Sequence, residues 1–424
     1  MRIVRDQEPG PGMSNALFSR NVAALAPSAT IAVSREAARL KAEGINIVDL
    51  GAGEPDFLTP RAVCDAATKA IAAGRHKYAP TEGTLDLRAA IARRQSLLSN
   101  GRAVNADNIV VSNGSKQALF NACLCLFGQR EKVLIPSPAW TSYPQIVHLA
   151  RATPVEVPGD PEWGLKVSVA DLDRFYDETV KGLIINSPVN PTGAVYALAE
   201  LKSIAEWARS KGVWIIADEI YRRIHYGNGP APSFLDLPDE LLEKVVVVDG
   251  ASKAYAMTGW RIGYALSPRP LAQTMAALQS HTTSGANTIA MYAATEAFAN
   301  DQVQAEVEAM TAAFRRRRDM LVNRFRTELP GTEYVDPLGA FYLFFRVDEV
   351  FSRNVPSATE FCRRLIADQG LALVPGAAFG DDRWVRLSYA ASEESLQDGM
   401  DRLVRHFQRL RGEAEPSNLE KLAR

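Results

Sequence analysis

Short apolar runs alternate with amphipathic helical stretches between about residues 60 and 270. Parallel strands need a crossover connection, usually a helix, so this alternation is typical of a mainly parallel sheet covered by helices. We therefore expect an α/β fold. The runs interpreted as strands are residues 108–112, 132–135, 182–186, 213–217, 245–248 and 261–266, and residues 119–127 and 198–210 are helical stretches between them.

The two ends of the chain have a different pattern. Residues 20–62 and 302–412 mix long charged helices with a few strand patterns, and we expect them to form one smaller α+β domain. The large domain would then comprise residues 63–301. Residues 1–19 carry charges and no apolar segment typical of a secretory signal, so we expect a flexible tail there. Residues 413–424 are polar and are expected to form a second tail.

The composition excludes several classes of function. The formal net charge is −1, which gives no electrostatic reason to expect nucleic acid or an anionic membrane as partner. No stretch approaches the roughly 18 consecutive apolar residues that cross a bilayer. The four cysteines have neither metal-binding nor redox C-x-x-C spacing, so we expect reduced thiols and no metal site. A cytoplasmic enzyme is consistent with these features.

Polar or aromatic side chains directly follow five of the predicted strands. In an open parallel sheet, ligands bind beyond the carboxyl ends of the strands. We therefore expect these groups to converge on one binding site. The segments are Asn113-Gly114-Ser115-Lys116, Ser137-Pro138-Ala139-Trp140, Ser187-Pro188-Val189-Asn190, Asp218-Glu219-Ile220-Tyr221 and Asp249-Gly250-Ala251-Ser252-Lys253.

Lys253 follows a run of four valines and lies among small residues. Desolvation disfavours the ammonium form of lysine, so such surroundings favour a neutral amine near neutral pH. A neutral amine condenses with an aldehyde, which is the opening step of pyridoxal 5'-phosphate (PLP) chemistry. A lysine in an exposed loop is the alternative for Lys253 taken alone, but its neighbours favour the reactive amine.

Asp218 follows an apolar strand, so its carboxylate is expected to be buried and to need a partner. The N–H of a pyridinium ring would be such a partner, in a hydrogen bond worth roughly 1.5–3 kcal/mol. Tyr221 and the amide of Asn190 could donate to an oxygen of the same ring. A helix N-cap is the alternative for Asp218 taken alone.

Three other positions have two interpretations each. Gly114 precedes a predicted helix N-terminus, which suits a phosphate or is an ordinary turn. Trp140 offers a flat face for a heteroaromatic ring or belongs to the core. Arg386 lies between apolar strand residues and is either an edge charge or an anchor for a carboxylate. The glycine spacings of nucleotide-binding loops do not occur at Gly114 or Gly51.

Taken together, these segments resemble the fold type I PLP-dependent aminotransferases, the aspartate aminotransferase superfamily. The resemblance covers roughly residues 20–410 in the family's order. It implies a seven-stranded, mainly parallel sheet in the large domain and a homodimer with shared active sites. The matching segments are Gly51-Ala52-Gly53-Glu54-Pro55-Asp56-Phe57, Lys77-Tyr78-Ala79-Pro80, Asn190-Pro191-Thr192-Gly193, Asp218-Glu219-Ile220-Tyr221, Ser252-Lys253, Gly259-Trp260-Arg261-Ile262-Gly263 and Val385-Arg386-Leu387-Ser388-Tyr389.

The resemblance also implies a role for each candidate residue. Lys253 would bind the PLP aldehyde and move the substrate proton, and Asp218 would pair with the ring nitrogen. The implied PLP contacts are Asn190 and Tyr221 at the ring oxygen, Trp140 stacked on the ring, Arg261 and the backbone of Gly114, Ser115 and Lys116 at the phosphate, and Tyr78 at the partner subunit's phosphate. The implied contacts of the substrate α-carboxylate are Arg386, Asn190 and the backbone of Gly53.

One position departs from the family pattern. Many relatives carry a serine three residues before the lysine as a phosphate ligand, and here that position is Gly250. Either a phosphate contact is lost or another group replaces it, and Ser252 is a candidate.

The substrate is predicted from two further segments. In animal and enterobacterial aspartate aminotransferases a partner-subunit arginine binds the second carboxylate, but the corresponding residues 281–287 contain no arginine. The chain is more similar to a bacterial branch that uses a lysine of the phosphate loop with hydroxyls near the N-terminus, a pattern that Lys116, Ser28 and Thr30 match. We therefore expect aspartate or glutamate as amino donor in a ping-pong cycle. Capping of a helix starting near Val33 is the alternative for the two hydroxyls.

Other activities remain open at this stage. Some members of that branch transaminate prephenate, and aromatic or neutral amino acids are alternatives on the same scaffold. A PLP lyase would turn over its substrate without a 2-oxo acid acceptor.

Overall fold

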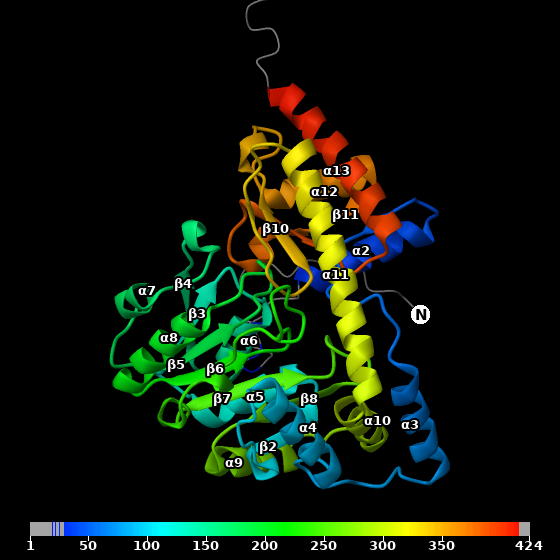
Figure 1. Cartoon of the computed structure of the whole chain (residues 1–424). Coiled ribbons are helices and arrows are strands. Elements are labelled where there is room, and N and C mark those ends of the chain that lie inside the picture. Colours follow the sequence, from blue (N-terminus) through cyan, green and yellow to red (C-terminus); the bar gives the residue numbers. More distant parts are fainter. Residues whose placement is uncertain (1–18, 20–21, 23–24, 26–28, 415–424) are drawn as a thin grey trace, which may run out of the picture.

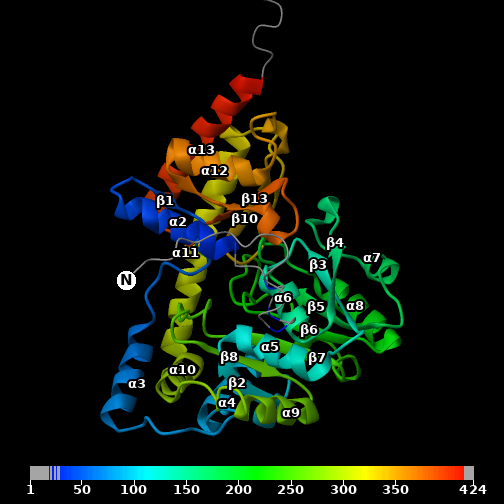
Figure 2. The ribbon, with the colours of Figure 1, turned by 180° about the vertical axis from the view of Figure 1, so that it is seen from behind.

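The computed structural model describes residue 19, residue 22, residue 25 and residues 29–414. Most of the two expected tails, and Ser28 among the expected substrate contacts, lie outside the described residues. Figures 1 and 2 show a lower part, built on the large sheet, and an upper part that carries β10, β13, α12 and α13.

The large sheet has seven strands in the order β2-β8-β7-β6-β5-β3-β4. The five strands from β7 to β4 run parallel, and β8 is antiparallel to both of its neighbours. The predicted α/β class and mainly parallel sheet are confirmed. The strands are β2 (Ile109–Asn113), β3 (Lys132–Ser137), β4 (Thr153–Pro158), β5 (Val180–Asn186), β6 (Trp214–Asp218), β7 (Val245–Gly250) and β8 (Ile262–Leu266).

Helices cover both faces of this sheet. Side chains alternate between the faces of a strand, and the valines of β7 show it: Val245 and Val247 pack with α8, whereas Val246 and Val248 pack with α5. The helices of this part are α3 (Arg61–Ala72), α4 (Leu85–Leu98), α5 (Ser115–Leu126), α6 (Ser142–Leu149), α7 (Val169–Arg174), α8 (Leu198–Lys211), α9 (Arg269–Ser280) and α10 (Thr288–Ala299).

The upper part contains a second, antiparallel sheet in the order β12-β13-β10-β9. A segment near the N-terminus also belongs to the upper part, because β1 (Val48–Asp49) pairs with β11 (Leu371–Ala372) in a separate two-stranded sheet. This pairing agrees with a small domain built from both chain ends, although the boundaries at residues 62 and 302 stay a prediction. The remaining elements are α2 (Ala29–Ala42), α11 (Asp301–Glu328), β9 (Tyr334–Val335), β10 (Tyr342–Arg346), α12 (Ala358–Gln369), β12 (Val374–Pro375), β13 (Trp384–Ser388) and α13 (Glu393–Ala414).

Helix α11 links the two parts: it runs from the upper part down to α10 (Figure 1). On this helix, Arg317 is only 8% exposed and donates two hydrogen bonds, of 2.7 and 2.8 Å, to the carboxylate of Asp56. The loop that carries Asp56 follows Gly53, so this ion pair fixes that loop to α11.

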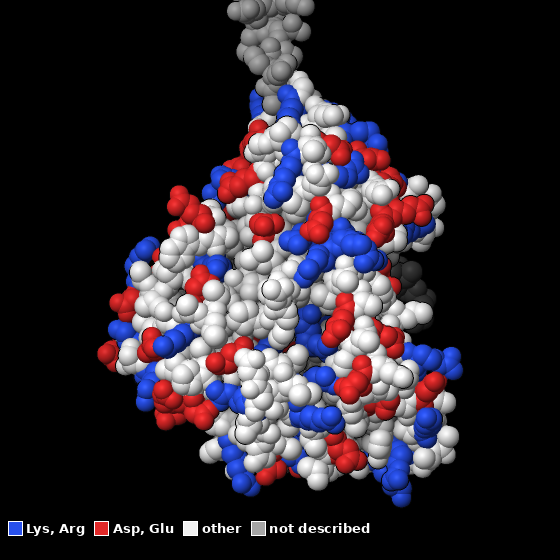
Figure 3. All heavy atoms as spheres, viewed as in Figure 1, with Lys and Arg blue, Asp and Glu red and all other residues white. Residues whose placement is uncertain are grey.

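The surface and the helices agree with the composition. Basic and acidic side chains are interspersed on the face shown in Figure 3, without an extended patch of one sign. Within the described part of the chain, no helix is long and apolar enough to cross a membrane. The expected cytoplasmic location stays a prediction.

Candidate active site

The carboxyl ends of the central strands open into a cavity of about 640 Å³. Its walls include the segments that follow β2, β3, β5, β6 and β7, which the sequence predicted to converge. Helix α2, Tyr342 of β10 and Arg386 of β13 form the remaining wall. The cavity therefore lies between the two sheets.

Lys253 lies in the turn that follows β7, and its half-buried amine donates a 2.6 Å hydrogen bond to the carbonyl of Gly53. Desolvation lowers the pKa of Lys253 to about 8, and the nearby carboxylate of Glu54 partly offsets this effect. Glu54 is itself held by a 2.9 Å hydrogen bond from the hydroxyl of Thr258. The neutral fraction of the Lys253 amine at neutral pH is therefore much larger than that of an ordinary lysine, although the ammonium form still predominates.

Asp218 ends β6 and is 3% exposed. Its Oδ2 accepts a 2.7 Å hydrogen bond from the hydroxyl of Tyr143, and its Oδ1 accepts one of 3.2 Å from the backbone N–H of Ile220. The contact with Ile220 closes a turn rather than a helix, so the helix N-cap alternative is wrong. Burial raises the pKa of Asp218 to about 6, against the two hydrogen bonds, which lower it.

The phenol of Tyr221 lies on the same side of the cavity. Its hydroxyl is 2.8 Å from the hydroxyl of Tyr342, and both rings are buried. Burial raises the pKa of both tyrosines, so both hydroxyls keep their protons at neutral pH. Each is therefore able to donate one hydrogen bond.

Arg386 lies on β13, between β12 and β10, and is 2% exposed. The edge-charge alternative is therefore wrong. Its Nη1 donates to Oδ1 of Asn190 at 2.9 Å and its Nη2 to the carbonyl of Gly51 at 2.8 Å, while Nε has no hydrogen-bond partner. No carboxylate of the described residues pairs with it. A buried, unpaired guanidinium in a cavity is a site for an anionic group.

Gly114 and Arg261 lie at the start of α5. Gly114 has a φ of +79°, and a Cβ there would come within 2.3 Å of Nη2 of Arg261. Only glycine therefore lets the guanidinium approach the helix N-terminus. Ser115 and Lys116 begin the helix, so their backbone N–H groups lie at the end where the dipole favours anions.

The space that a side chain at position 250 would need is occupied by Ser115. A Cβ at Gly250 would lie 2.7 Å from Oγ of Ser115 and 2.9 Å from Cα of Gly263. The Ser115 hydroxyl fills this position and donates a 3.0 Å hydrogen bond to the carbonyl of Asp249. There is no room for a larger residue at position 250, and Ser252 lines the cavity beside it.

Lys116, Trp140 and Thr30 all line the cavity. The Lys116 amine lies 4.9 Å from the centre of a ring of Trp140, and Thr30 lines the cavity from α2. Because α2 begins at Ala29, Thr30 lies inside its first turn and not before a helix that starts near Val33, so the capping alternative is wrong for Thr30. Desolvation, and then the charge of Arg261, lower the pKa of Lys116.

Among the described residues, two predicted contacts, Gly114 and Tyr78, do not line this cavity. Gly114 directly precedes the lining residues Ser115 and Lys116, whereas Tyr78 is 94% exposed and lies beside residues 283–289 on the surface. An exposed position is what a contact with a partner subunit requires, but its role stays a prediction.

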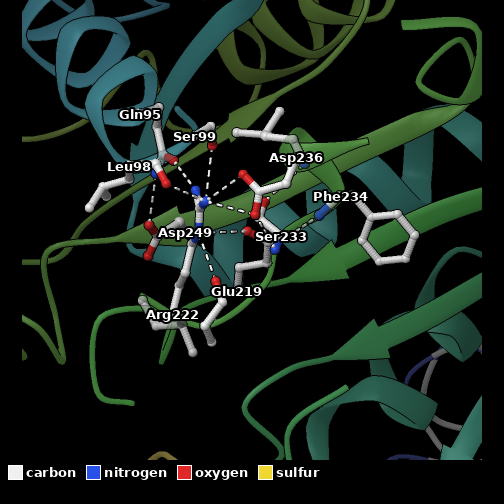
Figure 4. Close-up of polar contacts among 12 residues, drawn as sticks. Gln95, Leu98, Ser99, Glu219, Arg222, Ser233, Phe234, Asp236 and Asp249 are labelled. Atoms are coloured by element: carbon white, nitrogen blue, oxygen red, sulfur yellow. Dashed lines mark hydrogen bonds and ion pairs between the residues drawn. The ribbon is translucent and has the colours of Figure 1, made fainter. Parts of the chain in front are cut away.

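A buried polar network surrounds Arg222, which lies in the turn after β6 (Figure 4). Arg222, 1% exposed, donates from Nη1 to Oε1 of Gln95 at 2.8 Å and from Nη2 to Oγ of Ser99 at 2.9 Å. It also contacts Oδ1 of Asp236 at 3.2 Å. The guanidinium thus ties α4 to the turn that carries Asp218.

The network also contains two buried carboxylates. Gln95 donates to Oδ2 of Asp249 at 3.1 Å, and Oε2 of Glu219 lies 3.9 Å from Nε of Arg222. Burial raises the pKa of Asp249 to about 6 and that of Glu219 to about 7, and the charge of Arg222 opposes both shifts. Arg222 therefore favours the charged form of both carboxylates.

Residues 45–403 match the family described as aminotransferase class I and II. The chain belongs to this aminotransferase family. It is a PLP-dependent aminotransferase, as the resemblance implied.

Individual relatives agree with the family match. This chain is 39% identical to a probable aspartate/prephenate aminotransferase of Aquifex aeolicus, over 94% of its own length and 100% of the relative's length. The aspartate/prephenate aminotransferase of Thermus thermophilus is 40% identical over 92% and 98% of the two chains. The solved structure of aspartate aminotransferase from Thermus thermophilus with maleate superposes with a TM-score of 0.86 at 38% identity, covering 92% and 99%.

Sequence reasoning missed three residues of the aminotransferase cavity. Asn186 donates a 2.8 Å hydrogen bond to the carbonyl of Asp218, and it ends a predicted strand, so the strand-end rule could have found it. Tyr143 is three residues after Trp140, a helical spacing that could have placed both on one face. Tyr342 has no local signal, because its partner Tyr221 is far away in the sequence.

Proposed function

We propose that this aminotransferase transfers the amino group of an acidic amino acid, aspartate or glutamate, to a 2-oxo acid. The observation that carries the proposal is the position of Lys116. Lys116 lines the same cavity as Lys253, Arg386 and Thr30. A second carboxylate of the substrate would therefore find a cation and a hydroxyl in addition to the arginine that suits its α-carboxylate.

PLP is the proposed cofactor, and the residues present fit it. The donor set combines a lysine of lowered pKa, a buried carboxylate whose oxygens face the cavity wall, and a glycine-containing helix N-terminus beside Arg261. When bound, PLP supplies an aldehyde for an amine and a ring that accepts electrons. Asp218 would hold the ring nitrogen protonated, because a buried carboxylate is stabilised by a cationic N–H.

The other proposed PLP contacts follow from their places in the cavity. Tyr221 and Asn190 would donate to the ring oxygen, and Trp140 would stack on the ring. The phosphate would bind Arg261 and the backbone N–H groups of Ser115 and Lys116, with Gly114 allowing the close approach. Tyr78 would contact the phosphate of the partner subunit, which makes a homodimer part of the proposal.

Lys253 is the proposed acid and base. A group that takes and returns a proton works best with a pKa near the working pH, and the Lys253 pKa of about 8 satisfies this condition. The carbonyl of Gly53 orients the amine at 2.6 Å. Lys253 would take the proton from the substrate α-carbon and would deliver it to the carbon atom of the cofactor's aldehyde group.

Arg386 and Asn190 would bind the substrate α-carboxylate, together with the backbone of Gly53. The 2.9 Å hydrogen bond from Arg386 to Asn190 holds the guanidinium in place before the substrate arrives. Pre-organisation of this kind lowers the cost of ordering side chains on binding. Lys116, Thr30 and Ser28 would bind the side-chain carboxylate of the acidic substrate.

Steady-state kinetics with a panel of amino donors tests the proposal. Wild-type enzyme should prefer aspartate or glutamate to alanine, and Lys116→Ala should reduce kcat/KM for aspartate relative to alanine by about 10- to 100-fold, as expected for a hydrogen bond to a charged group worth roughly 1.5–3 kcal/mol. Lys202→Ala, on the surface of α8, is the matched control. Equal losses for aspartate and alanine would remove the case for acidic substrates.

A second candidate is prephenate as amino acceptor. The names of the relatives from Aquifex aeolicus and Thermus thermophilus favour it, since both include prephenate. Replacing 2-oxoglutarate by prephenate in the same assay decides between the acceptors. Turnover without any 2-oxo acid would instead indicate a lyase.

A further inference from the structure

Arg35 is a cation of the cavity to which the proposed function gives no role. Among the described residues, five cationic side chains line the cavity, against two carboxylates, Glu54 and Asp218. Four of the cations have proposed partners: Lys253 the cofactor, Arg261 the phosphate, Arg386 the α-carboxylate and Lys116 the side-chain carboxylate. The fifth is Arg35.

One face of α2 forms a wall of the cavity. The residues of this helix that line the cavity are spaced by three and four positions, which places them on one side of an α-helix. They are Thr30, Ile31, Ser34, Arg35 and Ala38. Arg35 therefore lines the same cavity as Thr30, five residues further along α2, and the Thr30 hydroxyl is proposed to bind the substrate side chain.

The carboxylates nearest to Arg35 along the helix bind another arginine. Glu36 and Glu43 both pair with Arg39, one turn further on. Arg35 has no carboxylate within 4.0 Å in residues 29–414, and its side chain is exposed. The guanidinium is thus available to an anion that enters the cavity.

We propose that Arg35 is a second cationic contact for the side-chain carboxylate of acidic substrates. This inference rests on the proposed preference for such substrates. Lys116 approaches from the N-terminus of α5 and Arg35 from α2, so the carboxylate is held from two elements. Because glutamate carries its carboxylate one methylene farther from the α-carbon than aspartate does, cations on two separate walls suit both lengths. The planar fork of arginine also allows two parallel hydrogen bonds to a carboxylate.

Arg35→Ala tests the inference, with Arg39→Ala as the matched control on the same helix. The first measurement is kcat/KM of the holoenzyme for glutamate, aspartate and alanine. In Arg35→Ala the ratio of acidic donor to alanine should fall about 5- to 30-fold, and Arg35→Lys should recover part of the loss. In Arg39→Ala the ratio should not change.

The second measurement is the affinity for glutarate and maleate, dicarboxylates that do not react, by calorimetry. Arg35→Ala should weaken both dicarboxylates by a similar factor and leave acetate unchanged. If wild-type enzyme prefers acidic donors and Arg35→Ala changes neither the ratio nor the affinity, this inference alone is wrong. If wild-type enzyme shows no preference for acidic donors, the proposed function and this inference both fall.

Discussion

Asp218→Asn should stabilise the PLP-free enzyme while it abolishes activity. In the free protein the carboxylate is buried with only neutral hydrogen-bond donors, and its pKa is about 6 instead of the ordinary 3.8. One pKa unit corresponds to about 1.4 kcal/mol, so the charged carboxylate costs the folded state about 3 kcal/mol well above pH 6. Asparagine has nearly the same shape: without the charge, its Oδ1 would still accept from the Ile220 N–H, and its Nδ2 would donate to the Tyr143 hydroxyl.

The sign of this effect depends on pH. Because the folded-state pKa is raised, the stability contribution of Asp218 is fully present below pH 3.8 and is lost as the pH rises to about 6. The gain in free energy of unfolding from Asp218→Asn should therefore be about 3 kcal/mol at pH 8 and about 1 kcal/mol at pH 4.5.

Urea unfolding of the PLP-free proteins, followed by tryptophan fluorescence at equal protein concentration, measures both values. Asp398→Asn is the control. The pKa of Asp398 is lowered by its hydrogen bond to Arg402, so its substitution should weaken the protein slightly at pH 8 and not at low pH. An Asp218→Asn variant that is no more stable than wild type at pH 8, or a gain that does not shrink at pH 4.5, would refute the reasoning.

Two further substitutions test the packing around the cavity. In Gly250→Ser the new Cβ would overlap Ser115, so the free energy of unfolding should fall by about 1–3 kcal/mol. For the same reason this substitution should weaken PLP binding instead of adding a phosphate contact. Tighter PLP binding would contradict this account. Arg222→Met should lower the free energy of unfolding by about 3–5 kcal/mol, since Glu219 and Asp249 would lose their buried cation; a loss below 1 kcal/mol would show that the network is dispensable.

The strands and the residues that follow them were predictable because both signals are local. The four valines of β7 form a buried strand from their own composition, and the parallel-sheet rule then places Lys253 beside Asp218 without any knowledge of the rest of the chain. The predicted edges of these strands differ from the structure by a few residues. For example, Arg261 precedes β8, in a positive-φ conformation, and is not its first residue.

Strand β4 was missed because its sequence contradicts the usual strand signal. Pro154 and Pro158 lie within its six residues, and proline cannot donate to a sheet. The strand is tolerated because it lies at the edge of the sheet, where it pairs only with β3. Sequence pattern alone does not distinguish such an edge strand from a loop.

Contacts between distant segments could not be predicted from the sequence, for a different reason. Arg222 and Gln95 are 127 residues apart, and neither has neighbours that indicate a buried network. Arg317 on α11 is a second case, because the sequence around it gives no sign of its ion pair with Asp56, 261 residues away. Such pairs depend on the tertiary fold, which periodicity does not specify.

The most direct test of the central claim is to find which lysine binds the cofactor. Borohydride reduces a C=N bond between a lysine amine and PLP to a stable C–N bond, which mass spectrometry of peptides then locates. We predict the modification at Lys253 alone, and in Lys253→Ala neither the visible absorbance of a C=N bond between lysine and PLP nor transaminase activity. A label on another lysine such as Lys116, or an active Lys253→Ala enzyme, would contradict the account.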